Sequence, residues 1–320
     1  MRALQWILGL GLAIVLLGVP LTGERFYVYL AIQILVLSLF ATGFNLLFGY
    51  TGLLSFGHAA FYASGAYATG LLLMHARLSL LPSVLGGALF AAALGLVVGF
   101  FCVRRTRIYF SMLTLAFGMM VYALAFDWRS VTGGDDGLIG IPRSPLWLPG
   151  LGALQMTALS AYYYFVLVMT AAGVWLVRRV VYSPFGLVLQ GIRENENRAS
   201  FAGIPVRRYR LAAFVTSCLI SGLAGAMVAP LENTVAPTAA HWTKSAEPVL
   251  ATLLGGIHSF AGPLVGALLF YLLQELIEQV TEYWLLWFGV VLLALVLGFR
   301  GGVVGYFQHH VLPALRRRLS

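Results

Sequence analysis

His58 is the residue of this chain whose type and position best suit proton chemistry. It directly follows a glycine-rich stretch, Gly49-Tyr-Thr-Gly-Leu-Leu-Ser-Phe-Gly57, and lies inside an apolar run. An ionisable side chain within a membrane span indicates a functional role by default, and a helix break there could open the imidazole to water. No acidic or basic residue lies near His58 in sequence. We therefore favour a histidine that hydrogen-bonds its neighbours over a proton carrier.

Ser64 could act as a nucleophile only within a suitable motif. Rhomboid-type intramembrane proteases carry Gly-x-Ser-Gly with a histidine on another helix, whereas this chain has Tyr62-Ala63-Ser64-Gly65. A serine beside a glycine in an apolar helix is commonly a point of close helix packing. We therefore predict no catalytic residue, and we do not expect the chain to be an enzyme.

Metal and nucleotide sites are not expected either. The six histidines lack metal-ligand spacing, and Cys102 and Cys218 lie singly in apolar runs, where they are expected to pack as small hydrophobic residues. The glycine-rich phosphate-binding loop that ends in Gly-Lys-Ser/Thr is absent. The sequence thus predicts no metal and no cofactor bound by this chain.

A charged run stands out between the apolar segments, within the stretch 183–205. Ser183-Pro184 is typical of a helix start, and Gly203 and Pro205 are typical of a stop. Leu187, Leu189 and Ile192 are expected to pack against the rest of the protein. The charged residues that follow are Arg193, Glu194, Asn195, Glu196, Asn197 and Arg198. This pattern favours a short surface helix that docks a protein partner; the alternative is a solvated connecting helix.

Composition defines the class of protein. Of 320 residues, 60% are hydrophobic and 10% are charged, against about 25% charged in ordinary soluble domains. The mean hydropathy is +0.90. Too few polar residues remain to cover a soluble surface. This excludes a soluble globular protein, a disordered chain and a nucleic-acid binder, despite the formal charge of +9. The lipid bilayer is the expected surrounding.

Apolar runs of about 20 residues predict the membrane spans. The third and eighth runs are bordered by glycines and are expected to be broken or re-entrant segments. If the protein moves a solute, the candidate breaks along its path are Gly52, Gly57, His58, Gly255 and Gly256. We predict an all-α transmembrane helix bundle of eight to ten spans in a single domain, 1–320. The runs are 3–21, 26–48, 52–74, 80–103, 108–126, 160–177, 210–230, 247–260, 263–281 and 283–299.

The distribution of basic residues predicts the orientation. With ten spans and a cytoplasmic N-terminus, 15 of the 20 lysine and arginine residues fall on the cytoplasmic side, as the positive-inside rule requires. Both termini are then cytoplasmic. Two groups of five spans would have opposite orientations, as in inverted-repeat transporters. Few charges lie within the spans, which suits a small net-neutral or zwitterionic solute.

Several stretches together resemble a known family. Arg193-Glu194-Asn195-Glu196, followed by Ala-Gly-Ile-Pro at 202–205, is similar to the permeases of branched-chain amino-acid ABC transporters, and to the LivM-type subunit more than to the LivH-type one. The resemblance covers about residues 30–300. The other matching stretches are Gly49–His58, Tyr109–Gly118, Thr132–Gly137 and Leu254–Pro263.

The resemblance implies an assembly with other chains. It implies a second, LivH-type permease, two cytoplasmic ATP-binding subunits that use the ATP, and a periplasmic substrate-binding protein, all at a bacterial inner membrane. Residues Arg193, Glu194, Asn195, Glu196 and Arg198 would contact an ATPase. The loops at 127–157 and 231–246 are candidate docking surfaces for the binding protein.

Two alternatives stay open at this point. A self-contained secondary transporter or channel would have the same composition. A permease of the same family for urea or short amides would have the same motifs, so the sequence does not identify the solute.

Overall fold

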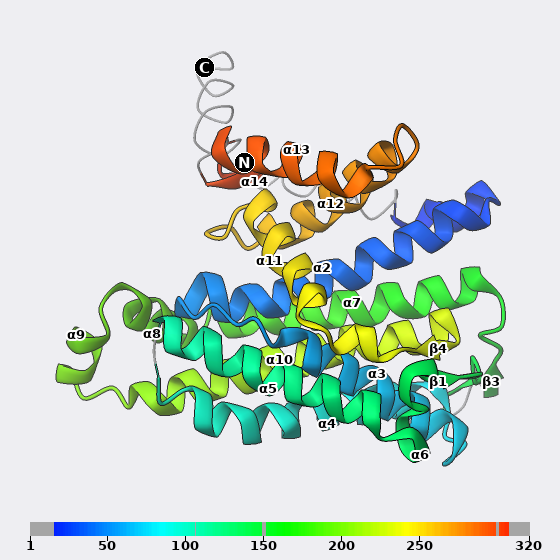
Figure 1. Ribbon diagram of the computed structural model, residues 1–320, viewed down its shortest axis with the longest axis horizontal. Coiled ribbons are helices and arrows are strands. Elements are labelled where there is room, and N and C mark those ends of the chain that lie inside the picture. Colours follow the sequence, from blue (N-terminus) through cyan, green and yellow to red (C-terminus); the bar gives the residue numbers. More distant parts are fainter. Residues whose placement is uncertain (1–15, 106, 149–151, 299–300, 307–320) are drawn as a thin grey trace.

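The computed structural model describes residues 16–105, 107–148, 152–298 and 301–306. Most of the predicted first span, 3–21, and the C-terminal end lie outside the described residues. Within them, the chain folds into a bundle of helices, most of which run roughly along one direction, with two small two-stranded ladders (Figure 1). The prediction of an all-α, multi-pass membrane bundle is confirmed.

Five helices of the described part are long and apolar enough to cross a bilayer. Each matches a predicted apolar run, because 20 or more residues without a breaking charge favour an uninterrupted helix. These helices are α2 (Arg25–Thr51), α4 (Leu80–Cys102), α5 (Arg107–Asp127), α7 (Leu159–Val181) and α10 (Val206–Glu232).

Four further apolar helices are shorter. They are α3 (His58–Met74), α11 (Trp242–Gly255), α12 (Gly262–Glu278) and α13 (Trp284–Gly298). The first two correspond to the runs that the sequence predicts to be broken. The chain leaves the helical conformation between Gly52 and Gly57 and again between Gly256 and Ala261. The total of ten spans and the inverted halves stay predictions.

Helices α2 and α10 form the centre of the bundle. Helix α10 packs on α2, α3 and α4, and α2 also packs on α7, α11 and α12. Small residues allow backbones to approach closely there: a Cβ added at Gly65 or at Gly225 would overlap the backbone of the facing helix, as expected for membrane helices. Large rings such as Phe40, Phe214 and Tyr162 fill the remaining core.

Short elements gather at the two ends of the bundle. Figure 1 shows α8 (Pro184–Glu194) and α9 (Glu196–Phe201) at one end, and α6 (Arg129–Thr132) with the strands at the other. Strand β1 (Leu138–Ile139) pairs antiparallel with β4 (Thr234–Val235), with Leu138 opposite Val235. Strand β2 (Leu146–Leu148) pairs with β3 (Gly152–Leu154). The β1–β4 pair joins the two loops that the sequence predicts to lie outside. The remaining short helices are η1 (Val19–Thr22), η2 (Gly134–Asp136), η3 (Pro237–Ala240) and α14 (Gly302–Tyr306).

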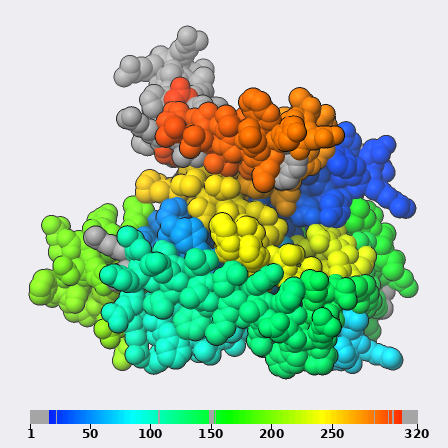
Figure 2. Space-filling model, viewed as in Figure 1, coloured from blue at the N-terminus to red at the C-terminus, as the bar shows by residue number. Residues whose placement is uncertain are grey.

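The outer surface of the bundle is strongly apolar. Helices α4, α5 and α13 expose large hydrophobic side chains such as Leu89, Met112 and Leu285. Figure 2 shows α12 and α13 lying over α11, while α4 and α5 form the opposite edge. Such an apolar surface suits contact with lipid or with a second membrane chain.

Candidate functional site

The charged stretch that the sequence singles out forms two short helices rather than one. Pro184 occupies the first turn of α8, where its missing N–H costs nothing. Asn195 then adopts an extended conformation, with φ of −157°. Its side chain accepts a hydrogen bond of 3.0 Å from the backbone N–H of Arg198, which caps the start of α9. The predicted stop agrees with the end of α9 at Phe201.

Two apolar residues anchor α8 to the bundle. Leu189 and Ile192 are buried, and α8 packs on α2, α7 and α10. Leu187 was expected to pack as well, but the structure corrects this expectation, since its side chain is 67% exposed. It lies two residues from Leu189 and therefore on another side of the helix. Helix α8 is held by one face and leaves the other open.

Arg193 connects α8 to both helix breaks. Its guanidinium donates to the carbonyl oxygen of Gly49 near the end of α2, and it lies 3.2 Å from Nδ1 of His258 in the turn after α11. Its aliphatic stem covers Gly52, where an added Cβ would lie 2.8 Å from Cγ of Arg193. Gly52 caps α2 with φ of +76°, a conformation that favours glycine.

Glu196 is held by an ion pair within the chain. Its two carboxylate oxygens accept hydrogen bonds of 2.7 and 2.9 Å from Arg210 at the start of α10. The side chain of Arg210 is 6% exposed, whereas that of Glu196 is 42% exposed. Bidentate pairing fixes geometry as well as charge. Glu196 therefore fastens α9 to α10.

An open cavity lies between α8, α9 and the end of α2. Its volume is about 440 Å³. Glu194 and Arg198 are exposed, and no ion pair in the described part of the chain engages either side chain. The arrangement offers charged groups of both signs to a partner outside the bundle. The cavity is lined by Thr51, Gly52, Leu53, Ile192, Arg193, Glu194, Asn195, Glu196, Asn197 and Arg210.

The first break, residues 52–57, is non-helical backbone held by its neighbours. Ser111 of α5 donates a hydrogen bond of 2.6 Å to the carbonyl of Leu54. The amide of Ala59, in the first turn of α3, donates to Oγ of Ser245 on α11 at 2.8 Å. Irregular backbone at membrane depth is tolerated when protein groups satisfy it. Helix α3 thus begins inside the bundle, on a segment that α5 and α11 hold.

His58 lies in an aromatic core rather than at a cavity. It is fully buried, and Phe44, Phe61 and Phe214 pack edge-on to its ring. Its Nε2 lies 2.7 Å from Oγ of Ser217. Because Ser217 donates its own hydrogen to the carbonyl of Gly43 at 2.6 Å, Nε2–H of a neutral imidazole is the donor to the serine. This geometry fits a structural role for His58.

The other glycines of the candidate path allow close backbone contact. A Cβ at Gly57 would overlap the carbonyl of Thr114 on α5, and one at Gly255 would overlap the carbonyl of Gly262 on α12. Gly256 has φ of +116° and lies against Gly301. Each glycine therefore has a packing reason, and the structure brings only Gly52 next to the charged stretch.

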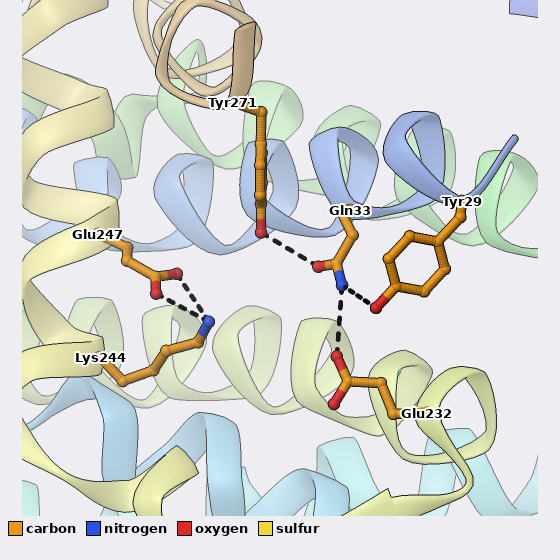
Figure 3. A network of polar contacts seen from close by, with 6 residues as sticks. All are labelled: Tyr29, Gln33, Glu232, Lys244, Glu247 and Tyr271. Carbon is orange, nitrogen blue, oxygen red and sulfur yellow. Dashed lines mark hydrogen bonds and ion pairs between the residues drawn. The ribbon is translucent and has the colours of Figure 1, made fainter. Parts of the chain in front are cut away.

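A second polar cluster, which the sequence analysis missed, lies toward the other end of the bundle (Figure 3). Lys244 and Glu247 of α11 form an ion pair of 2.8 Å. The amide of Gln33 on α2 donates to Glu232 at the end of α10, at 3.3 Å, and its oxygen accepts from the hydroxyl of Tyr271 on α12 at 3.1 Å. The sequence signal that could have indicated this cluster is Lys244, because it is the single lysine of the chain.

Comparison with known proteins identifies the family. Residues 26–299 match the model of the branched-chain amino acid transport system / permease component. The chain is 27% identical to the LivM permease of Escherichia coli K12, over 87% of this chain and 70% of the relative. It is 23% identical to the LivH permease of Salmonella typhimurium LT2, over 77% and 83%. It is also 30% identical to the L-arabinose ABC transporter permease AraH of Azospirillum brasilense, over 70% and 66%.

No solved structure matches the chain. The family match covers the described helices from α2, except its first residue, to the end of α13, including α8, α9 and both helix breaks. With its five long apolar helices, the protein is a multi-pass membrane protein, and it belongs to the family of permease components of branched-chain amino acid transport systems.

Proposed function

We propose that this chain is a permease subunit of an ATP-driven importer for branched-chain amino acids. The family match and the similarity to LivM, along 87% of the chain, support this function. The chain would act as a single transmembrane domain, 1–320, in a bacterial inner membrane, with both termini cytoplasmic. Catalysis would belong to other subunits, and ATP would be used there.

The proposal includes three kinds of partner. Similarity to both LivM and LivH supports pairing with a second, LivH-type permease. Two cytoplasmic ATP-binding subunits would supply the energy, since the sequence has no phosphate-binding loop. A periplasmic binding protein would deliver the solute to the end of the bundle formed by β1, β4 and η3.

One observation carries the proposal: Arg193 connects the exposed α8–α9 segment to both helix breaks. Residues Arg193, Glu194, Asn195, Glu196 and Arg198 then have different tasks. Glu194 and Arg198 face a partner. Asn195 caps α9, Glu196 ties it to α10, and Arg193 transmits a displacement of α8 to the ends of α2 and α11. The breaks at Gly52, Gly57 and His58 and at Gly255 and Gly256 are where the path would open, with His58 in a structural role at the start of α3.

Reconstitution by omission tests this function. The complete set of two permeases, two ATPases and binding protein, placed in liposomes, is expected to accumulate radiolabelled leucine only with ATP. This chain alone is expected to transport nothing. Uptake by the chain alone, without ATP, would instead identify a self-contained transporter or channel. Accumulation of urea or a short amide but not leucine would support the proposed assembly of subunits and contradict the proposed substrate.

A further inference from the structure

A small cavity lies beside the polar cluster of Figure 3, at the end of the bundle opposite α8 and α9. Its volume is about 190 Å³, and it lies between α3, α10 and the segment that leads from β4 into α11. Charged residues occur on two of its sides. Its lining includes Tyr62, Ala66, Val228, Glu232, Val235 and Lys244.

The two charged lining residues have opposite signs and come from different helices. The ammonium of Lys244 is held by Glu247 through contacts of 2.9 and 2.8 Å, and it lies 5.7 Å from the centre of the Tyr62 ring. A lysine ammonium has three donors, so this pair leaves it able to bind a second anion. Figure 3 shows Lys244 and Glu232 pointing into the same space between α11 and α10.

Glu232 differs from Glu247 because no cation pairs with it among the described residues. Its carboxylate accepts a 3.3 Å hydrogen bond from Nε2 of Gln33. Gln33 is itself held by Tyr29, at 2.9 Å, and by Tyr271, at 3.1 Å. Lys244, Glu247 and Glu232 together carry one excess negative charge. The cluster thus presents an oriented carboxylate that lacks a cationic partner, facing an ammonium that can take an anion.

We propose that this cavity binds the zwitterionic main-chain group of an amino acid, with its carboxylate on Lys244 and its ammonium on Glu232. The inference rests on the proposed function and adds the contacts that recognise the cargo inside this chain. Occupancy would complete an alternating row of charges: Glu247, Lys244, the ligand carboxylate, the ligand ammonium and Glu232. Charge-assisted hydrogen bonds at both ends would favour a zwitterion over a neutral solute.

The remaining walls suit an uncharged side chain. Ala66, Val228 and Val235 are apolar and nearly fully buried, and Thr234 and Thr238 are polar but carry no charge. Gln33 acts as a positioning residue, since it touches Glu232 rather than the ligand. Glu232 is exposed and Lys244 is half-buried, so a solute can reach both charges from outside the bundle.

Two variants and one matched control test the site. Glu232→Gln keeps the shape and removes the charge that would meet the ammonium, and Lys244→Met removes the charge that would meet the carboxylate. Glu278→Gln is the control, since Glu278 is exposed at the end of α12 and does not line the cavity. Complete transporter complexes in nanodiscs, without binding protein, are titrated with radiolabelled leucine. Assembly with the ATPases is checked for each variant.

Each variant is expected to weaken leucine binding about tenfold, as the loss of one charge-assisted hydrogen bond predicts, while Glu278→Gln binds like the unmodified complex. Competition adds a test that misfolding would not imitate. The unmodified complex should prefer leucine over 4-methylpentanoate, which lacks the ammonium, and Glu232→Gln should lose most of this preference. The Glu232→Gln complex should still prefer leucine over leucinamide, which lacks the carboxylate.

The proposal is overturned if the unmodified complex binds no leucine, or if Glu232→Gln discriminates against 4-methylpentanoate as strongly as the unmodified complex. Failure of the proposed function gives a different result, because it would abolish ATP-driven leucine uptake by the unmodified, fully reconstituted system. Uptake with no dependence on Glu232 or Lys244 would contradict this site alone.

Discussion

His58 and Ser217 illustrate how a single polar contact can be buried in an apolar bundle without carrying protons. The serine relays the histidine N–H to the carbonyl of Gly43, and aromatic rings enclose the imidazole. No acidic side chain forms an ion pair with His58 in the described part of the chain. The pair therefore joins α3 to α10 and, through Gly43, to α2.

We expect His58→Gln to retain most transport. A glutamine amide can donate to Ser217 as Nε2–H does, so assembly and leucine uptake by the complete complex should remain within about twofold of the unmodified protein. His58→Phe keeps an aromatic ring at this position but leaves Ser217 without its donor. It should lower the free energy of unfolding by about 1 kcal/mol. Loss of uptake in His58→Gln, with normal assembly, would show that the imidazole titrates during transport.

Glu196 and Arg210 allow a second test at the scale of residues. Because Arg210 is almost buried, Glu196→Gln leaves a buried guanidinium without its anion, and α9 loses its attachment to α10. We expect amide hydrogen exchange in 196–201 to accelerate about tenfold, as the loss of about 1.5 kcal/mol from a charged hydrogen bond implies. Glu278→Gln, the same change on another exposed helix end, should leave this segment unchanged. Unchanged exchange in Glu196→Gln would mean that other contacts hold α9.

Some helices could be predicted from the sequence and others could not. The long spans were predictable, because about 20 apolar residues without a charge have few alternatives to a membrane helix. The breaks near Gly52 and Gly256 were also predictable from glycine. The division between α8 and α9 was not, since it depends on the side chain of Asn195 capping α9 instead of continuing α8.

The sequence could not predict which side chains contact each other when they lie far apart in the chain. Gln33 and Glu232 are 199 positions apart, and no periodic pattern connects them. Leu187 was expected to be buried, although its neighbours already occupy the face of α8 that meets the bundle. Charges near the ends of spans were predicted as a class, but their partners depend on how the helices pack.

The exposed face of α8–α9 leads to a prediction at the scale of elements. Glu194→Arg reverses the charge of a side chain that has no ion pair in the described structure, so folding should be preserved. Like charges placed together at a contact cost several kcal/mol. We expect the ATPase activity stimulated by loaded binding protein to fall at least tenfold, with membrane insertion preserved. Glu278→Arg is the matched control on another helix end and should couple normally, and normal coupling by Glu194→Arg would indicate that α8 does not dock the ATPase there.

The molecule has two distinct ends, which are expected to lie on opposite sides of the membrane. Helices α8 and α9 lie at one end, where Arg193 meets His258, and the β1–β4 ladder lies at the other (Figure 1). The cavity near Lys244 is lined in part by β4. The arginine bias of the sequence predicts that the first end is cytoplasmic.

Reporter fusions test this orientation. A fusion after Ser320 should be active as a cytoplasmic reporter, and an insertion at 132–137 should be active as a periplasmic one. Matching insertions at 200–203 should behave like the C-terminal fusion. A periplasmic C-terminus, or 132–137 on the same side as 200–203, would reject the assignment.

The central claim, that ATPase subunits drive this chain through α8–α9, is tested most directly by site-specific cross-linking. The native Cys102 and Cys218 are fully buried and can remain. Arg198→Cys is placed on the exposed face of α9. Ser130→Cys, exposed on α6 at the opposite end and outside the cavity near Lys244, is the control. In the complete complex, we expect a cross-link from residue 198 to an ATPase subunit and none from residue 130. Absence of the cross-link from residue 198 in a complex that transports leucine normally would contradict this claim.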